Sequence, residues 1–506
     1  MIPLLAFLLA PVAFVPMDDR PVTSELAPML GRIAGRPVLE PPRSLLGHYL
    51  QAGSPEGIIA WLNTQTRSAN DYVISADMLA YGGLIASRTP VHRFEDAEFR
   101  LRELRALRSR KPRAWIGAFG TVMRLAPTGV PASQSSFFAA YPAWLYLQQF
   151  ANLHDPPNSN ELAEAQRLRS LIGEPTLQAY LDARQRNYGI DTVLVRLTAQ
   201  RAIDQLVLGQ DDAGPVGLHV KEVRALVQAV QDAGAGDRIA IEPGADELGM
   251  ALVARALARG ANWAPRVAVR YSMPNGGAYA DPLEYAPIEV TIDSLIKLCG
   301  GVRDDVTPDL ILYVRDASTD AAHDAALMQA MQIDEAAGRS VSFADLTFLE
   351  NTYVDQARFA ERLLSSGAAG GLDAYSSWNT DANTVGTALA EAIAAGAGRR
   401  RGTYDDLAHK EFTFTRLVDD YAFHDYVRPM LNATLDAQGI TDHMYVTGET
   451  ESALAMVDRA ALWNRATTIL ARLYPGYHIA SMQITLPWNR TFETQVEAAL
   501  APDLGG

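Results

Sequence analysis

AFVPMDDR, at residues 13–20, decides the fold class, because a short apolar run, Ala13–Pro16, gives way at once to charged residues. Apolar runs of this kind recur along the chain, each followed by polar or Gly-rich residues and then by a helical pattern. They are Tyr72–Ser75, Ala114–Ala118, Gln205–Leu208, Ile239–Ile241, Val267–Val269, Leu310–Val314, Val341–Phe343 and a ninth near Leu372–Tyr375. Strands that are apolar throughout and alternate with helices are typical of a parallel sheet covered on both faces.

Helical patterns rich in Ala, Leu, Arg and Glu lie between these runs, most clearly over Phe94–Arg110, Asn160–Asn187, Val220–Ala233 and Ala321–Ala337. We therefore expect an α/β fold built from repeated βα units. These units fit a modified (β/α)8 barrel-like parallel sheet, which we favour, or two doubly wound sheets side by side. In both arrangements the active site lies at the carboxyl ends of the strands.

Composition excludes several classes of protein. The 506 residues hold 44 Lys and Arg against 59 Asp and Glu, and the net charge of −15 argues against nucleic-acid binding. Hydrophobic residues at 48% and charged residues at 20% are ordinary for a soluble globular protein, which excludes disordered and fibrous classes. The one cysteine, Cys299, forms no intramolecular disulfide, and we expect it to be a buried small hydrophobic residue.

The sequence divides into three parts. Residues 1–13 belong to the apolar stretch MIPLLAFLLAPVAF and are either a signal peptide or the lead-in to the first strand, so export to the periplasm or beyond and a cytoplasmic location are equally supported. Residues 14–398 form the α/β main domain. From GRRRGTYDD onward the βα rhythm is lost, so we expect residues 399–506 to be a mostly helical region packed on it. No other segment has the roughly 18 apolar residues of a membrane helix.

Acidic and amide side chains follow many of the predicted strands. Two adjacent pairs, Asp211 with Asp212 and Asp246 with Glu247, are the candidate catalytic residues. The candidate substrate contacts are Asp18, Asp19, Arg20, Asp77, Tyr81, Arg124, Asp345, Trp378, Asn379 and Asn383. A single Asp or Asn after a strand also serves as an ordinary helix N-cap, which is an equal explanation for Asp77, Asp345 and Asn383. Adjacent acids are harder to explain as caps, because the second carboxylate adds repulsion unless a cation or a substrate offsets it.

Two carboxyl groups in different surroundings divide into a neutral proton donor and an ionised stabiliser, which is how glycosides are hydrolysed. Adjacent acids also suit the hydrolysis of N-acetylated sugars, in which one acid orients the acetamido group and the other protonates the leaving oxygen. The motifs of serine hydrolases, P-loop enzymes, Rossmann dehydrogenases and zincins are missing from the sequence. We therefore expect a metal-independent glycosidase that acts on a small-molecule or glycan substrate, and as its more specific form we expect an amino-sugar or cell-wall-type glycan.

Two alternatives stay open at the level of sequence. The same acids and amides suit a non-catalytic protein that binds a sugar or polyol. They also suit a divalent-metal-dependent hydrolase in which the strand-end Asp residues hold Mg²⁺ or Ca²⁺ through oxygen ligands.

Seven tracts resemble, in order, the bacterial family catalogued as domain of unknown function 4127. They are FVPMDDRPV, SADMLAYGGLIASR, FGTVMRLAPT, LGQDDAGPVG, PGADELGM, SSWNTDANTVGTALA and LPWNRTFE, which together run from about Phe14 to Glu493. The resemblance implies that most of the candidate residues, together with Trp488, Asn489 and Arg490, lie in the signature tracts of the family, and it implies no particular activity. The family pattern has Gly and Ala in place of Ser377 and Asp381, so the resemblance does not carry Asp381 into the site.

Overall fold

The computed structural model describes residues 9–125, 158–212, 214, 217–280, 284–347 and 353–503. In this part of the chain the strands form a six-stranded sheet, a five-stranded sheet and a two-stranded hairpin. All neighbours in the two larger sheets run parallel, so the α/β expectation is confirmed. No closed barrel is found among these strands, and the barrel-like arrangement is not confirmed.

The first sheet has the strand order β2-β1-β3-β4-β5-β6. Its strands are β1 Val12–Val15, β2 Val38–Leu39, β3 Asp71–Ser75, β4 Trp115–Val122, β5 Gln205–Gln210 and β6 Ile239–Pro243. The chain passes from β1 to β2 on one side and then returns to build β3 on the other side of β1. The carboxyl ends of β1 and β3 therefore flank a topological switch point, where ligands bind in open α/β sheets.

The second sheet repeats the order of the first five strands. It runs β8-β7-β9-β10-β11, so that β7 holds the place of β1 and β8 the place of β2. Its strands are β7 Arg266–Tyr271, β8 Val302–Arg303, β9 Leu310–Arg315, β10 Ser340–Asp345 and β11 Ala374–Ser376. The nine apolar runs of the sequence are all strands here, while the two-residue strands β2 and β8 carry no apolar run of their own.

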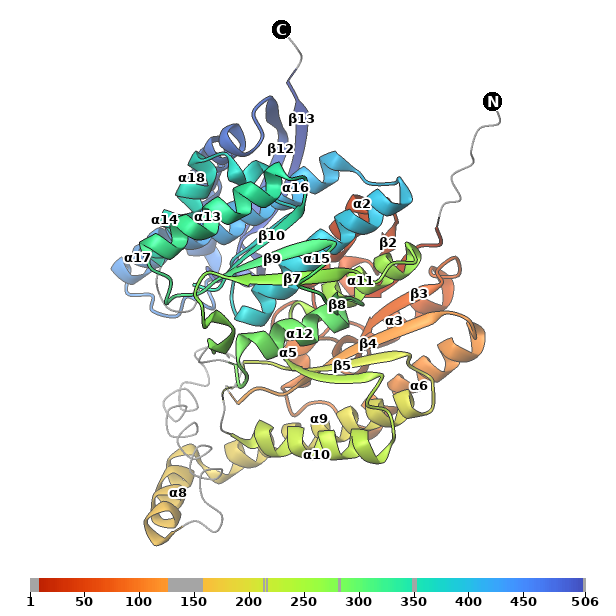
Figure 1. The fold of residues 1–506 in the computed structure, drawn as a ribbon. Coiled ribbons are helices and arrows are strands. Elements are labelled where there is room, and N and C mark those ends of the chain that lie inside the picture. The colour runs from red at the N-terminus through yellow and green to blue at the C-terminus, as the bar shows by residue number, and fades with distance from the viewer. Residues whose placement is uncertain are drawn as a thin grey trace.

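A shared layer of helices lies between the two sheets (Figure 1). It consists of α2 Leu26–Ile33, α11 Leu248–Gly260, α12 Ile288–Leu298 and α15 Asp381–Arg401. One hydrophobic cluster joins these helices to Phe14 and Phe119 of the first sheet and to Leu312 of the second. Because both sheets bury one face against the same helices, the molecule has five layers that alternate between helices and sheets.

Separate helices cover the outer faces of the two sheets. Against the first sheet lie α3 Pro55–Thr64, α4 Ala76–Tyr81, α6 Phe94–Arg110, α9 Glu174–Ala199 and α10 Leu218–Asp232. Against the second lie α13 Ala321–Ala336, α14 Tyr353–Ser365 and much of the C-terminal region. The helices expected from the sequence are confirmed, except that Gly173 breaks the expected helix Asn160–Asn187 into α8 Ser159–Ile172 and α9.

The C-terminal region consists of α16 Asp406–Arg416, a π-helix η5 Leu417–Val427, α17 Arg428–Ala437, α18 Gly448–Leu473 and the hairpin β12 Tyr477–Thr485 with β13 Gln495–Pro502. An eleven-residue π-helix is unusually long. The turn of the hairpin brings Trp488 back to the residues that follow β1, where it contacts Asp19.

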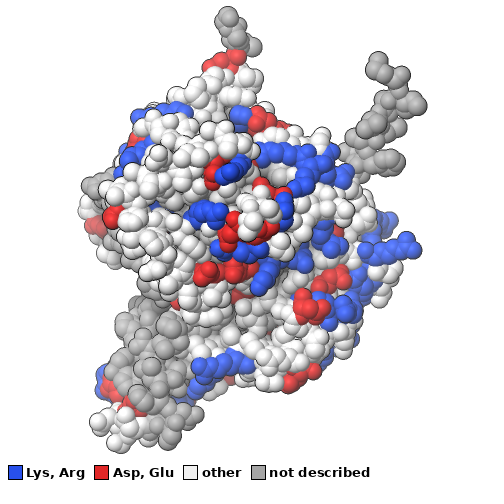
Figure 2. All heavy atoms as spheres, in the orientation of Figure 1, with Lys and Arg blue, Asp and Glu red and all other residues white. Residues whose placement is uncertain are grey.

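The chain begins its first strand at Val12, which is paired with both β2 and β3. A cut near Ala13 would therefore remove half of β1, whereas Met1–Leu8 lies outside the described residues. Cys299 is buried and free, as expected. None of the described helices is both long enough and apolar enough to cross a membrane. On the face drawn in Figure 2, acidic and basic side chains lie side by side.

Candidate functional site

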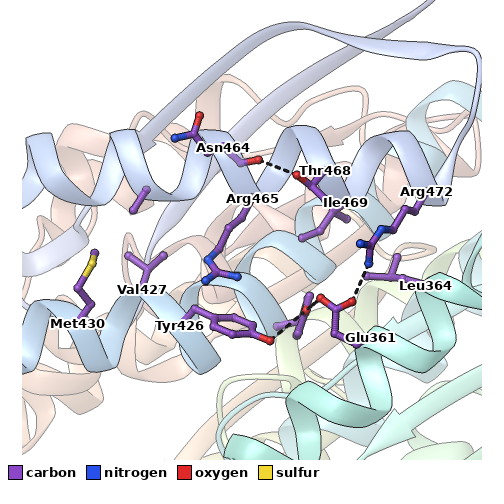
Figure 3. Close-up of a pocket in the computed structure, with 12 residues that line it drawn as sticks. Glu361, Leu364, Tyr426, Val427, Met430, Asn464, Arg465, Thr468, Ile469 and Arg472 are labelled. Atoms are coloured by element: carbon purple, nitrogen blue, oxygen red, sulfur yellow. Dashed lines mark hydrogen bonds and ion pairs between the residues drawn. The ribbon is translucent and has the colours of Figure 1, made fainter.

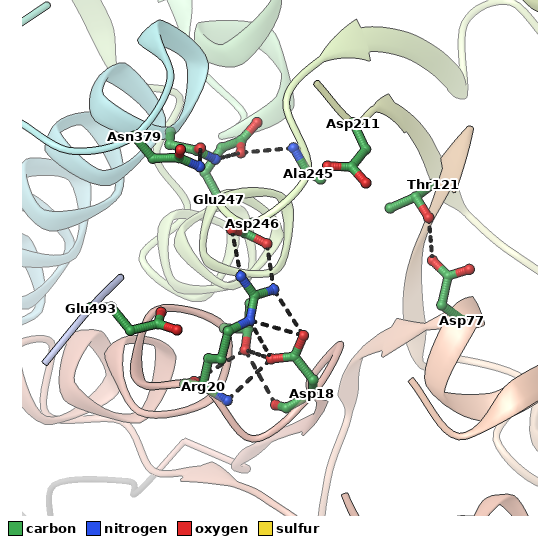
Figure 4. A network of polar contacts seen from close by, with 12 residues as sticks. Asp18, Arg20, Asp77, Thr121, Asp211, Ala245, Asp246, Glu247, Asn379 and Glu493 are labelled. Carbon is green, nitrogen blue, oxygen red and sulfur yellow. Dashed lines mark hydrogen bonds and ion pairs between the residues drawn. The ribbon is translucent and has the colours of Figure 1, made fainter. Parts of the chain in front are cut away.

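Arg20 is the centre of a buried charge network at the carboxyl end of β1 (Figure 4). Its guanidinium binds the Asp18 carboxylate at 3.0 Å through Nε and at 2.8 Å through Nη2, and it binds both oxygens of Asp246 at 2.9 and 2.7 Å. Burial alone lowers the pKa of Arg20, but the Asp18, Asp246 and Glu493 carboxylates outweigh burial and raise the pKa well above its ordinary value. Arg20 is therefore a fixed cation that joins the acids after β1 and β6.

Asp77 and Asp211 form a second part of the site, at the ends of β3 and β5. Asp77 is 5% exposed, and one of its oxygens accepts a hydrogen bond from the Thr121 hydroxyl at 3.0 Å. Burial raises the pKa of Asp77 to about 7, and the Asp211 charge adds to this rise. Burial also raises the pKa of Asp211, although an ion pair with Arg88 opposes the rise. Both carboxyl groups therefore keep a proton more readily than an exposed aspartate does.

Asp212 has different surroundings from its neighbour Asp211. Its carboxylate accepts a hydrogen bond from Nη1 of Arg124 at 2.5 Å, and its side chain is 27% exposed. Two acids that are adjacent in sequence thus differ in burial and in their arginine partner, since Asp211 is buried beside Arg88 and Asp212 is partly exposed beside Arg124.

Glu247 is a buried acid behind the loop that follows β6. It is 0% exposed, and its Oε2 accepts hydrogen bonds from the backbone of Ala245 at 3.1 Å and from Nδ2 of Asn383 at 2.5 Å. Within the described residues its Oε1 has no hydrogen-bond partner. Burial raises the pKa of Glu247 well above its ordinary value, so the neutral form is favoured. Glu247 holds the start of α15 against the first sheet.

The loop before α15 brings residues from the second sheet to the carboxyl ends of the first. Thr380 and Asn383 form a capping box that starts α15. The amide of Asn379 donates a hydrogen bond to Oδ1 of Asn383 at 2.8 Å, so the two amides orient each other. Trp378 instead packs into the core, where its indole nitrogen donates to Thr387 at 3.1 Å.

A cavity of about 10 Å³, roughly the space of one water molecule, lies among these elements. Its lining consists of Gln210, Asp211, Asp212, Gly244, Ala245, Asp246, Glu284, Asn379, Thr380 and Asn383. Four of these ten residues are acids, and none of the ten is a Lys or Arg. Arg20, Arg88 and Arg124 pair with three of these acids without lining the cavity, so the wall offers mainly carboxylate, amide and hydroxyl oxygens. Such a wall suits a group that donates hydrogen bonds, such as a single hydroxyl group of a larger ligand.

The turn of the C-terminal hairpin covers the network from one side. The indole nitrogen of Trp488 donates a hydrogen bond to Oδ1 of Asp19 at 2.6 Å. The guanidinium carbons of Arg20 and Arg490 lie 4.9 and 4.7 Å from the centre of a Trp488 ring, and the Tyr49 ring packs on Trp488 at 5.5 Å. Residues of the last tract, LPWNRTFE, are thus part of the site.

Backbone strain gathers at the same place. Of the seven described non-glycine residues with a positive φ, five belong to this region, namely Tyr49, Asp212, Asn379, Trp488 and Asn489. A left-handed conformation costs an ordinary residue about 1 to 2 kcal/mol, and such costs concentrate at functional sites. The clustering is a sign of function that is independent of the charges.

The structure brings together most of the residues expected from the sequence. They are Asp18, Asp19, Arg20, Asp77, Arg124, Asp211, Asp212, Asp246, Glu247, Asn379 and Asn383. Tyr81 is buried one turn after Asp77, with the Arg186 guanidinium 4.7 Å from its ring centre. Asp345 lies at the end of β10, where it binds Arg315 at 3.1 Å and Thr347 at 2.9 Å.

Several residues of the site were not among those candidates. Arg88 and Thr121 contact Asp211 and Asp77, and Glu284 lines the cavity. Arg88 ends the SADMLAYGGLIASR tract and Trp488 lies in LPWNRTFE, so the tracts contained a signal for both. Glu284 lies far from any predicted strand end, and no pattern of the sequence marks it.

Comparisons with known proteins place the chain in a family. The family model described as "Protein of unknown function (DUF4127)" matches residues 12–497, nearly the whole chain. No curated protein and no solved structure matches the chain. Within the described residues, no group of three or more His, Cys, Asp or Glu side chains is arranged to hold a metal ion.

Proposed function

We propose that this chain, which belongs to the DUF4127 family, is a hydrolase that cleaves a carbohydrate with a pair of carboxyl groups and without a metal. One observation carries the proposal. Asp211 and Asp212 follow the same strand, yet burial raises the pKa of Asp211, whereas Asp212 is 27% exposed and is paired with Arg124. Glycoside hydrolysis needs this division between a proton donor and an anion.

Asp211 acts as the proton donor in this proposal. Its proton goes to the oxygen of the leaving group as the glycosidic bond breaks. The water molecule that adds to the anomeric carbon gives its proton to the Asp211 carboxylate, which restores the acid and completes the hydrolysis. Asp77 lies in the same buried surroundings, and burial raises its pKa to about 7. Thr121 orients Asp77 through its hydrogen bond at 3.0 Å.

Asp212 stabilises the positive charge that develops on the sugar ring. The ion pair with Arg124 keeps the Asp212 carboxylate in place. Asp246, Asn379 and Glu284 in the cavity wall accept hydrogen bonds from the hydroxyl groups of the sugar. The adjacent acids also suit an N-acetylated sugar, in which Asp212 orients the acetamido group.

The test is a hydrolysis screen with aryl glycosides, including those of N-acetylated amino sugars, with and without EDTA. We expect release that EDTA leaves unchanged. D212N should lower kcat by roughly 10²- to 10⁴-fold on every substrate, the size of a catalytic carboxylate effect. D211N should lose much more activity on phenyl than on nitrophenyl glycosides, because the acidic nitrophenol leaves without help from a proton donor. D237N, at a 72% exposed side chain, is the matched control.

Three outcomes would contradict the proposal. Release that is lost on chelation would indicate a divalent-metal hydrolase. Full activity of D212N would remove the carboxylate assignment. Tight binding of a glycan without any product would leave a non-catalytic sugar- or polyol-binding protein, for which the same cavity wall is suited.

A further inference from the structure

A second cavity lies on the outer side of the second sheet, away from the acids of the first (Figure 3). It has a volume of about 410 Å³, within the range of small-molecule sites. Its walls come from α14, the π-helix η5, the start of α17 and α18. Because these helices also pack on one another through a hydrophobic cluster, the walls are fixed by the core of the C-terminal region.

Arg465 of α18 is the unusual residue of this cavity. Its guanidinium carbon lies 3.6 Å from the centre of the Tyr426 ring, and Figure 3 shows the side chain reaching from α18 toward that ring. Within the described part of the chain, Arg465 forms no hydrogen bond and no ion pair. The guanidinium therefore keeps the donors of its planar fork for an acceptor that is not part of the protein.

The nearest acid does not supply that acceptor. Glu361 accepts hydrogen bonds from Arg472 at 2.6 Å and from the Tyr421 hydroxyl. These partners hold the carboxylate at one end of the cavity, and together with the charge of Arg465 they lower the pKa of Glu361 despite partial burial. Glu361 thus attracts Arg465 through its charge, but its hydrogen bonds go to Arg472 and Tyr421, so the donors of the Arg465 guanidinium stay open to a further acceptor.

The other end of the cavity is apolar. Val427, Met430 and Ala461 line it, and Figure 3 shows Val427 and Met430 on the side of Arg465 that faces away from Glu361. Met430 is 40% exposed, and Val457, one helical turn before Ala461, is 41% exposed. An apolar strip therefore continues from the cavity along α18.

The geometry points to a binding site for an organic carboxylate with a short apolar tail. The carboxylate lies on the open fork of Arg465, and the tail lies against Val427, Met430 and Ala461. The arrangement accounts for both features of the cavity, since an inorganic anion would leave the apolar end empty and a neutral apolar molecule would leave Arg465 unpaired. The site is separate from the proposed hydrolase and does not depend on it.

Calorimetric titration of the full chain with octanoate tests the site, with octan-1-ol as the neutral probe of equal tail length. We expect octanoate to bind with a Kd below about 1 mM. R465Q should weaken octanoate at least about tenfold and leave octan-1-ol unchanged, because the lost contact is a charge-assisted hydrogen bond. R465K keeps the positive charge but lacks the planar guanidinium, so its affinity for octanoate should lie between that of R465Q and that of the wild-type protein.

R459Q is the matched control, since Arg459 is an exposed residue of the same helix outside the cavity. R459Q should bind octanoate with the affinity of the wild-type protein. Equal octanoate affinity in R465Q and R459Q would overturn the proposal, as would a Kd above about 10 mM for the unchanged protein. M430Q should lower the affinity for octanoate but not for acetate, which would confirm the position of the tail.

Discussion

At the scale of single residues, the site depends on acids whose surroundings differ. Asp77, Asp211 and Glu247 are buried, and burial raises the pKa of each, whereas Asp212 and Asp246 meet arginines directly. Sequence alone showed that acids follow the strands, and it correctly grouped most of them. It could not show which acid keeps a proton, because burial and the arginine partner are set by residues far away in the chain.

The raised pKa of Asp77 predicts a pH-dependent effect of D77N on stability. In the unfolded chain the carboxyl ionises near 3.8, and in the folded chain it ionises near 7. The folded state therefore binds the extra proton between these values, and the contribution of Asp77 to stability is lost as pH rises from about 4 to about 7. D77N removes this loss, so its free energy of unfolding relative to the unchanged protein should rise with pH, by at most on the order of 4 kcal/mol.

Urea unfolding of both proteins at pH 5 and pH 8 measures the effect. The asparagine can still accept the hydrogen bond from Thr121, so the packing of the site is kept. A difference between the two proteins that is the same at both pH values would show that Asp77 does not titrate in this range.

At the scale of elements, the nine main strands could be predicted because each is a continuous apolar run. β2 and β8 were missed because two residues are too short for any pattern, and both are partly exposed or exposed. The break between α8 and α9 at Gly173 was also missed, although its φ of 85° is one that glycine readily adopts. The helical periodicity continues on both sides of this glycine and conceals the break.

The contact between β6 and α15 predicts a large effect of G244A. Gly244 has a φ of 91°, and a Cβ atom there would lie 2.2 Å from Oε1 of Glu247 and 2.7 Å from Cβ of Ala382. The substitution should therefore cost the strain of a left-handed residue and also push α15 away, about 3 to 5 kcal/mol in total. Thermal or urea unfolding measures this cost.

G234A is the matched control for G244A. Gly234 has a φ of 58°, and no atom lies within 4 Å of the position its Cβ would take. Its cost should be limited to the backbone, about 1 kcal/mol. Equal losses of stability in the two variants would mean that α15 does not press on the loop after β6.

At the scale of the whole molecule, the sequence left the barrel and the two-sheet arrangement open, because an apolar run shows that a strand is buried but not which strand it pairs with. The repeated order of the two sheets emerges only from the pairing. The same order places α15, which follows the last strand of the second sheet, against the acids of the first. The candidate site is therefore built from both sheets, and neither sheet holds all of it.

The helices shared by the two sheets predict that the sheets lose their structure together. Leu389 of α15 is 0% exposed and lies in the cluster that joins both sheets, so L389A should cost about 3 to 5 kcal/mol. Hydrogen exchange in increasing urea, followed by mass spectrometry on peptides from β4 and β9, measures each sheet separately. In L389A, both peptides should lose protection at the same urea concentration, and that concentration should be lower than in the wild-type protein. L162A, at a 56% exposed residue of α8, should leave both unchanged, and a fall in β9 alone would show that the two sheets are independent folding units.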